Sequence, residues 1–315
     1  MSLNLMTYHF KNPSARGYFL VLVFFAFFGS TQAQRKPDTT VVEDREFLQL
    51  LQKSKELNEE QKWRARRTTN VRVLRVLADD EDTGVRFSVA FNKATPADAL
   101  IRLSLDPNES IRWAVAMNLS IPDGVMIDLV ADYAEIVRLG LAANPNMSTE
   151  VLTILAEDVS VAVRRKAAAN PNTDPLVLGD LASDQERSVR LAVAANPQAP
   201  PSVMEQFSLS PDEALRLATA QNKGAASAVL LSLVFDSSVE VRKLVASHKD
   251  MPASGLLRLA EDANLAVRQA VVGNATTPSD ALEILAFDGE VSIRQEARNR
   301  LGKLLKKQIA EDRER

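Results

Sequence analysis

The chain has 315 residues, of which 46% are hydrophobic and 25% are charged, and these fractions are typical of a globular protein with a buried core. Its net charge of −3 argues against nucleic acid as a partner, because nucleic-acid-binding proteins neutralise phosphates with Lys and Arg. The sequence contains no Cys, which excludes disulfides and cysteine-held iron–sulfur clusters.

The first 33 residues have the layout of a secretory signal peptide. Lys11 and Arg16 precede the apolar run YFLVLVFFAFF over 18–28, and the small residues Thr31 and Ala33 stand at cleavage-site spacing. An uncleaved membrane anchor is the alternative, but 11 apolar residues are short against the ~20 that cross a bilayer. Cleavage removes two positive charges and no acid, so the mature chain carries −5. We expect a secreted protein, periplasmic in a Gram-negative host, without stable membrane insertion.

After a charged amphipathic segment over 41–70, the chain repeats itself with a period of 26 residues. A Val-Arg pair, replaced by Ile-Arg or Leu-Arg in three copies, recurs without insertion. Internal repeats of about 20–50 residues indicate a solenoid, in which each unit buries its apolar face against its neighbours. The arginines of this column are Arg86, Arg112, Arg138, Arg164, Arg190, Arg216, Arg242, Arg268 and Arg294.

Each repeat is predicted to hold two helices. Asp, replaced once by Ser210, stands six residues before the arginine and is expected to cap the start of a longer helix, such as one over 185–195. Asn, replaced once by His248, stands six residues after the arginine. We expect Asn-Pro to end this helix, because Asn tolerates the left-handed conformation in which helices often finish. A shorter helix follows, opened in several repeats by Pro and carrying leucines in helical register, such as Leu100 and Leu103.

These features predict an all-α solenoid of eight 26-residue two-helix repeats with helical caps at both ends. We assign the signal peptide to 1–33 and an N-terminal helical cap with a partial repeat to 34–84. The eight repeats occupy 85–292, and a C-terminal capping helix occupies 293–315. In this last segment Arg300 stands where the column Asn would fall.

The repeat resembles the leucine-rich repeat variant family, whose units read roughly VRxxVAxNPxTPxxxLxxLAxD. The segments VRRKAAANPNTDPLVLGDLASD (163–184) and VRLAVAANPQAPPSVMEQF (189–207) follow this pattern, and the resemblance covers about residues 71–298. It implies a right-handed α-solenoid of paired short helices, one α and one 3₁₀. Asp and Arg six apart also resemble HEAT repeats, in which such pairs form a ladder between layers. Some family members carry a cysteine-bound iron–sulfur domain, which this sequence cannot hold, so the resemblance implies a binding scaffold and names no substrate.

The recurring polar columns are interpreted as structural, and we predict no catalytic residue, cofactor or metal. The arginine column could form an anion-binding stripe, but it recurs together with the aspartates, so we expect ion pairs between them. His248, the only His left after signal cleavage, occupies the Asn column and lacks the partners of a catalytic triad or a metal site. We therefore expect a protein that is not an enzyme.

One surface departs from the repeat pattern. We count the residue before each column arginine as position one of the repeat. At 100° per residue along the longer helix, positions one and five then face the core, and positions three and seven point away from it. The outward positions are aromatic near the N-terminal end and polar near the C-terminal end. A large exposed apolar patch suggests a partner site, with Trp as a typical anchor; the alternative is that 41–70 or neighbouring helices bury it. The candidate partner-binding residues are Phe87, Phe91, Trp113, Met117, Leu139, Leu191 and Leu217.

The sequence therefore predicts an exported, non-catalytic scaffold that binds a protein or peptide along one face. One alternative is a carbohydrate or cell-wall ligand that stacks on Trp113 and Phe87. Another is a HEAT-like enzyme acting on nucleic acid, which would need a basic groove and a protein that is not exported. The array is predicted to be most flexible over 207–227, where Ser210 replaces Asp and Gly224 follows an Asn that lacks its Pro.

Overall fold

The structure, a computed structural model, describes residues 67–314, with side chains through residue 306. These residues belong to one compact unit, Ser54–Arg315. All of their regular structure is helical, which confirms the predicted all-α solenoid. No helix in this part of the chain is both long enough and apolar enough to span a bilayer. The predicted signal peptide lies outside the described residues, as do residues 41–66 of the charged amphipathic segment over 41–70.

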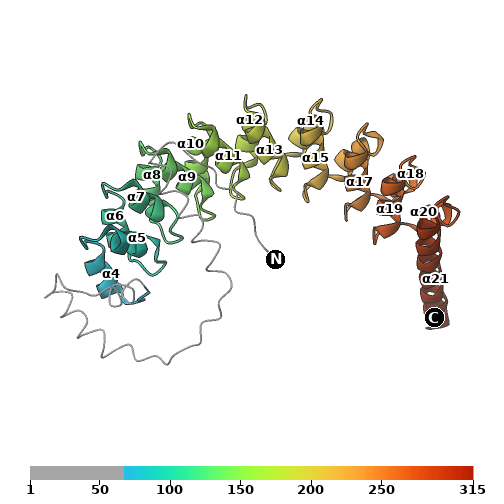
Figure 1. Ribbon diagram of the computed structural model, residues 1–315, viewed down its shortest axis with the longest axis horizontal. Helices are drawn as coiled ribbons and strands as arrows, with labels where there is room; N and C mark the ends of the chain where they lie inside the picture. Colours follow the sequence, from blue (N-terminus) through green and yellow to red (C-terminus); the bar gives the residue numbers. More distant parts are fainter. Residues whose placement is uncertain (1–66, 315) are drawn as a thin grey trace, which may run out of the picture. The chain divides into compact units, whose positions relative to one another are not determined.

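The helices stack in chain order as two rows (Figure 1). Each helix of the first row packs against the next helix of that row, one repeat further along the chain. The first row consists of α5 (Thr83–Phe91), α7 (Glu109–Ala116), α9 (Glu135–Ala143), α11 (Val161–Ala169), α13 (Arg187–Ala195), α15 (Glu213–Gln221), α17 (Val239–Ser247) and α19 (Leu265–Gly273). The second row consists of α4 (Val71–Leu77), α6 (Ala97–Leu103), α8 (Asp123–Leu129), α10 (Thr149–Ala156), α12 (Pro175–Leu181), α14 (Pro201–Ser208), α16 (Ser227–Ser232), the 3₁₀ turn η2 (Leu233–Phe235), α18 (Ala253–Leu259) and α20 (Ser279–Leu285). A longer helix, α21 (Val291–Glu314), follows.

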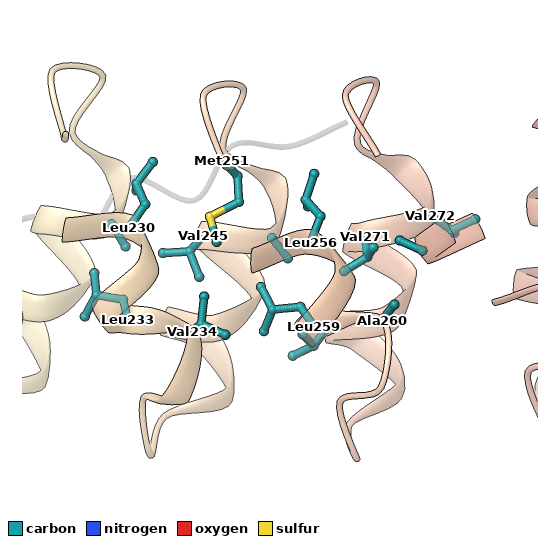
Figure 2. Packing of buried hydrophobic residues seen from close by; sticks show 14 of the residues in the cluster. Leu230, Leu233, Val234, Val245, Met251, Leu256, Leu259, Ala260, Val271 and Val272 are labelled. Atoms are coloured by element: carbon teal, nitrogen blue, oxygen red, sulfur yellow. The ribbon is translucent and has the colours of Figure 1, made fainter. Parts of the chain in front are cut away.

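The core lies between the two rows and runs from one repeat into the next. Positions one and five of the first-row helices are buried, as predicted; in α17 these are Val241 and Val245. Leucines of the second row, such as Leu256 and Leu259 of α18, close the core from the other side. In Figure 2 the side chains of successive repeats point toward one another between the helices. A single repeat lacks the partner surfaces for this burial, so the layers stabilise each other.

The second-row helices are α-helical, and the expectation of 3₁₀ helices is wrong except at η2. In α6 the amide of Leu100 donates to the carbonyl of Pro96 at 3.1 Å, four residues back. Its buried residues Ala99, Leu100 and Leu103 form one stripe at α-helical spacing, which a 3₁₀ helix with 3.0 residues per turn would spread apart. Hydrogen bonds that span three residues occur at both ends of this helix, from the amide of Ala99 to the carbonyl of Pro96 and from the amide of Asp106 to the carbonyl of Leu103.

The column aspartates do not cap the first-row helices as predicted. Asp184 accepts the amide of Glu186 at 2.8 Å and so closes a turn before the helix. The capping residue of α13 is Glu186, in extended conformation, and the helix begins at Arg187 rather than at residue 185. The sequence pattern fits both arrangements, because Asp satisfies a free amide two residues later in a cap and in a turn alike.

The column asparagines end the helices without the expected left-handed conformation. Asn170 is extended, with φ −72° and ψ 131°, and no non-Gly residue in the described part of the chain has positive φ. The side-chain nitrogen Nδ2 of Asn170 donates to two backbone carbonyls of the preceding repeat, those of Ala142 at 3.0 Å and Asn144 at 2.9 Å. Its side-chain oxygen accepts the amide of Asn172 at 3.0 Å. The helix therefore ends because Asn170 is bound to the preceding repeat.

Candidate functional site

The arginine column forms the predicted ion pairs, and these join successive layers. Each pair links an arginine to the aspartate twenty residues later, with Nε to Oδ2 distances of 2.6–2.7 Å. The Nη1 of each arginine also donates to the backbone carbonyl of the residue six positions before it, as Arg138 does to Asp132 at 2.7 Å; this residue is an aspartate in every pair except that of Arg216, where it is Ser210. Both edges of these guanidinium groups are engaged, which leaves no anion-binding stripe at the paired positions. The pairs are Arg86–Asp106, Arg112–Asp132, Arg138–Asp158, Arg164–Asp184, Arg216–Asp236, Arg242–Asp262 and Arg268–Asp288.

In this ladder of Arg–Asp pairs, hydrogen bonds hold the carboxylates of Asp132, Asp158, Asp184, Asp262 and Asp288 in their charged form, because the pKa of each lies below its ordinary value. The hydrogen bond from Arg164 keeps the pKa of Asp184 below its ordinary value, and the same bond raises the pKa of Arg164. At Asp158 burial acts to raise the pKa, but the hydrogen bonds from Arg138 and from a turn amide outweigh it, and the pKa is lowered. These groups serve as structural ion pairs at neutral pH and are unsuited to proton transfer there.

The asparagine column is structural as well, and His248 takes part in it. The Nδ1 of His248 accepts the amide of Asp250 at 3.2 Å, so its Nε2–H donates to the carbonyl of Asn222, also at 3.2 Å. Arg300 fills the same place after the last asparagine and donates to the carbonyl of Asn274 at 2.7 Å. His248 is thus an interlayer hydrogen-bond donor.

Three of the predicted partner-binding residues form a stack of rings, which we call the aromatic cluster: Phe87 and Phe91 of α5 and Trp113 of α7. The ring centroids lie 6.2–6.4 Å apart, and the ring planes deviate by 1–16°. Phe87 and Trp113 are half-buried, and 39% of Phe91 is exposed. Nearly parallel rings on successive helices thus form one apolar cluster that is partly accessible to solvent.

A glycine of the next repeat positions the indole of Trp113. Gly140 lies inside α9, and a Cβ atom built there would come within 2.8 Å of Cδ1 of Trp113. The indole therefore lies next to both the α9 backbone and the two phenylalanine rings. Sequence reasoning missed this contact, although a glycine inside a predicted helix is a signal for close packing.

The remaining candidates do not join the ring stack. Met117 follows the last turn of α7, and Leu139 and Leu191 are half-buried on α9 and α13. Leu217 of α15 is half-buried and packs against the hydrophobic core of the C-terminal repeats. Of the seven candidates, Phe91 is the most exposed, and the other six are half-buried.

The clefts between successive loops are open to solvent, and residues of the Arg–Asp pairs form part of their lining. One cleft of about 340 Å³ is lined by Leu105, Pro107 and Tyr133 beside Arg112, whose guanidinium carbon lies 4.7 Å from the Tyr133 ring centroid. Across residues 67–306, no three His, Asp or Glu side chains converge as metal ligands would. The aromatic cluster is therefore the candidate site.

Comparison with solved structures identifies the architecture. A structure described as a leucine-rich repeat variant with a novel repetitive structural motif matches with a TM-score of 0.53 and 24% identity, over 71% of this chain and 88% of that one. The chain has the leucine-rich repeat variant fold. A designed armadillo repeat protein is aligned over 74% of this chain and 99% of that one, at 15% identity and a TM-score of 0.20. No protein-family model matches the sequence, and no curated protein matches it either.

Proposed function

We propose that this chain is an exported, non-catalytic repeat scaffold that binds a protein or peptide through the aromatic cluster. The observation that carries the proposal is the ring stack of Phe87, Phe91 and Trp113, set in a framework whose polar columns bind one another. Flat, rigid aromatic side chains provide contact area at low entropic expense, and they dominate the binding energy of protein interfaces. An apolar side chain of the partner would pack on the exposed face of these rings.

The test is binding by the tagged full chain and by variants in the cluster. We expect Phe87→Ser and Trp113→Ser to lose at least tenfold in affinity for a partner purified from the envelope fraction of the source organism. Leu176→Ser is the matched control, because this leucine of α12 is 81% exposed and lies outside the cluster. Circular dichroism melting must first show that each variant remains folded.

Equal affinity of the cluster variants and the Leu176→Ser control would refute the site. A large loss of stability in Trp113→Ala together with unchanged binding would assign the cluster to folding instead. Nearly parallel rings also favour stacking of a sugar, so saturable binding of purified cell-wall glycan, lost in the cluster variants, would replace the peptide with a carbohydrate.

Export is the second part of the proposal and rests on residues 1–33. We expect the mature protein in the periplasmic fraction of a Gram-negative host, with Gln34 as its first residue. N-terminal sequencing of the fractionated protein measures this directly. Retention of the full-length chain in the cytoplasm would contradict it.

A further inference from the structure

One arginine inside the ladder has no partner for one edge of its guanidinium group. The Nη1 of Arg190 donates to the carbonyls of Asp184 at 2.6 Å and Gln185 at 2.8 Å, as the other column arginines do to theirs. The group is therefore oriented like its neighbours. Position 210, where the other repeats supply an aspartate, holds Ser210, and no acidic side chain among the described residues pairs with Arg190.

Ser210 keeps the turn but not the carboxylate. Its Oγ accepts the amide of Asp212 at 3.1 Å, where an aspartate oxygen accepts the corresponding amide at 2.8 Å in the preceding repeat. The Nε and Nη2 of Arg190 and the hydroxyl hydrogen of Ser210 remain as donors without an acceptor in the described part of the chain. In the preceding repeat the residue equivalent to Ser210 is Asp184, which accepts from Nε and Nη2 of Arg164, so the repeat geometry places Ser210 beside these two donors of Arg190. Together the three donors match the needs of an oxyanion.

The nearby acids do not fill the gap. Both oxygens of Asp212 are bound by Arg187, at 2.5 and 2.8 Å, and this hydrogen bonding lowers the pKa of Asp212 to about 2. Asp184 is paired with Arg164. Arg190 thus carries a positive charge that no ion pair balances, since Glu186, exposed at the start of α13, forms none with it.

We propose that Arg190 and Ser210 form a binding site for one carboxylate group of a ligand. The carboxylate accepts from Nε and Nη2 of Arg190, as aspartate does in the other repeats, and from the hydroxyl of Ser210. The planar fork of arginine is suited to two parallel hydrogen bonds with such a group. This site stands independently of the aromatic cluster and adds an acidic group to the chemistry that the array recognises.

The test is a titration followed by NMR of the arginine Nε–H groups of the protein. Two probes distinguish the sources of the carboxylate: N-acetyl-aspartic amide represents an acidic side chain, and N-acetylglycine represents a chain terminus. Sodium chloride keeps the ionic strength constant and serves as the reference for unspecific ion effects. We expect a saturable shift of the Arg190 signal with at least one probe, and unchanged signals from the paired arginines.

Ser210→Asp is the matched control variant, because it installs the residue found at this position in the neighbouring repeats. It should abolish the shift by occupying the edge of Arg190 from within the chain. A shift no larger than that with chloride alone would overturn the proposal. A shift of equal size in Ser210→Asp would do so as well, because binding would then not need the gap.

Discussion

Thr219 of α15 offers a sharp test of how the core is built, because it buries a hydroxyl without a hydrogen-bond partner. The side chain is 0% exposed, and its Oγ1 has no acceptor or donor in contact. The same position of the adjoining repeats holds Val193 and Val245, which are equally buried. Thr219→Val replaces the hydroxyl with a methyl group of the same shape and should therefore stabilise the protein.

The size of the effect follows from the burial. An unsatisfied polar group in the core costs about 1–3 kcal/mol, and removing it recovers this penalty. For a domain of about this size, each kcal/mol raises the melting temperature by roughly 2–4 °C. We expect a gain within that range of free energy, visible as a higher urea midpoint by circular dichroism.

Thr173→Val is the matched control, and the opposite sign is expected. The Oγ1 of Thr173 donates to the carbonyl of Ala167 at 2.5 Å, and the side chain is 1% exposed. That carbonyl keeps its hydrogen bond from the amide of Asn170, so the loss should be about 1 kcal/mol. A gain in both variants, or a loss in both, would refute the role assigned to the hydroxyl and attribute the effect to Val itself.

Three further predictions use the same denaturation assay. Asn144→Ala should destabilise by about 3 kcal/mol, because a fully buried side chain loses three hydrogen bonds; a loss below about 1 kcal/mol would contradict the interlayer role of the asparagine column. His248→Asn should stabilise by about 1 kcal/mol, since the amide can reach the carbonyl of Ala220 in addition to the bond that His248 already makes; no gain would mean that this carbonyl is out of reach. The unfolding free energy should be level above about pH 5 and decrease as the pH falls below about 4. The reason is that the hydrogen bond from Arg164 lowers the pKa of Asp184 in the folded state, so the stability it adds is lost on protonation; stability unchanged down to pH 2 would contradict this.

Much of this architecture was predictable, because a fixed period aligns equivalent residues. The buried valines, the two helices of each repeat and the pairing of Arg with Asp all follow from columns that recur together. The period does not show which layer of the array a polar side chain contacts. Asn170 was expected to act only on its own helix end, yet its amide binds the preceding layer. That contact depends on the offset between layers, which no single repeat encodes.

The sequence predicts that the residues of the aromatic cluster face away from the core, but not that their rings pack together. Helical periodicity places Phe87, Phe91 and Trp113 away from the core. Their stacking depends on the spacing between α5 and α7. The position of the Trp113 indole depends on Gly140 in the following repeat. The same rule placed Leu217 outward, although it packs against core residues, because neighbouring layers cover part of that face.

In a repeat array of this kind, a polar group that lacks the partner found in the other repeats is a candidate for ligand binding. Column residues satisfy one another across layers, so a substitution in one column leaves a defined partner without its contact. Ser210 looks harmless within its own turn, where it accepts the expected amide. Its consequence lies one layer back, at Arg190, which lacks a carboxylate that its counterparts bind. A departure from the repeat must therefore be traced to the residue it fails to contact, and here that residue is an arginine able to bind an acidic ligand.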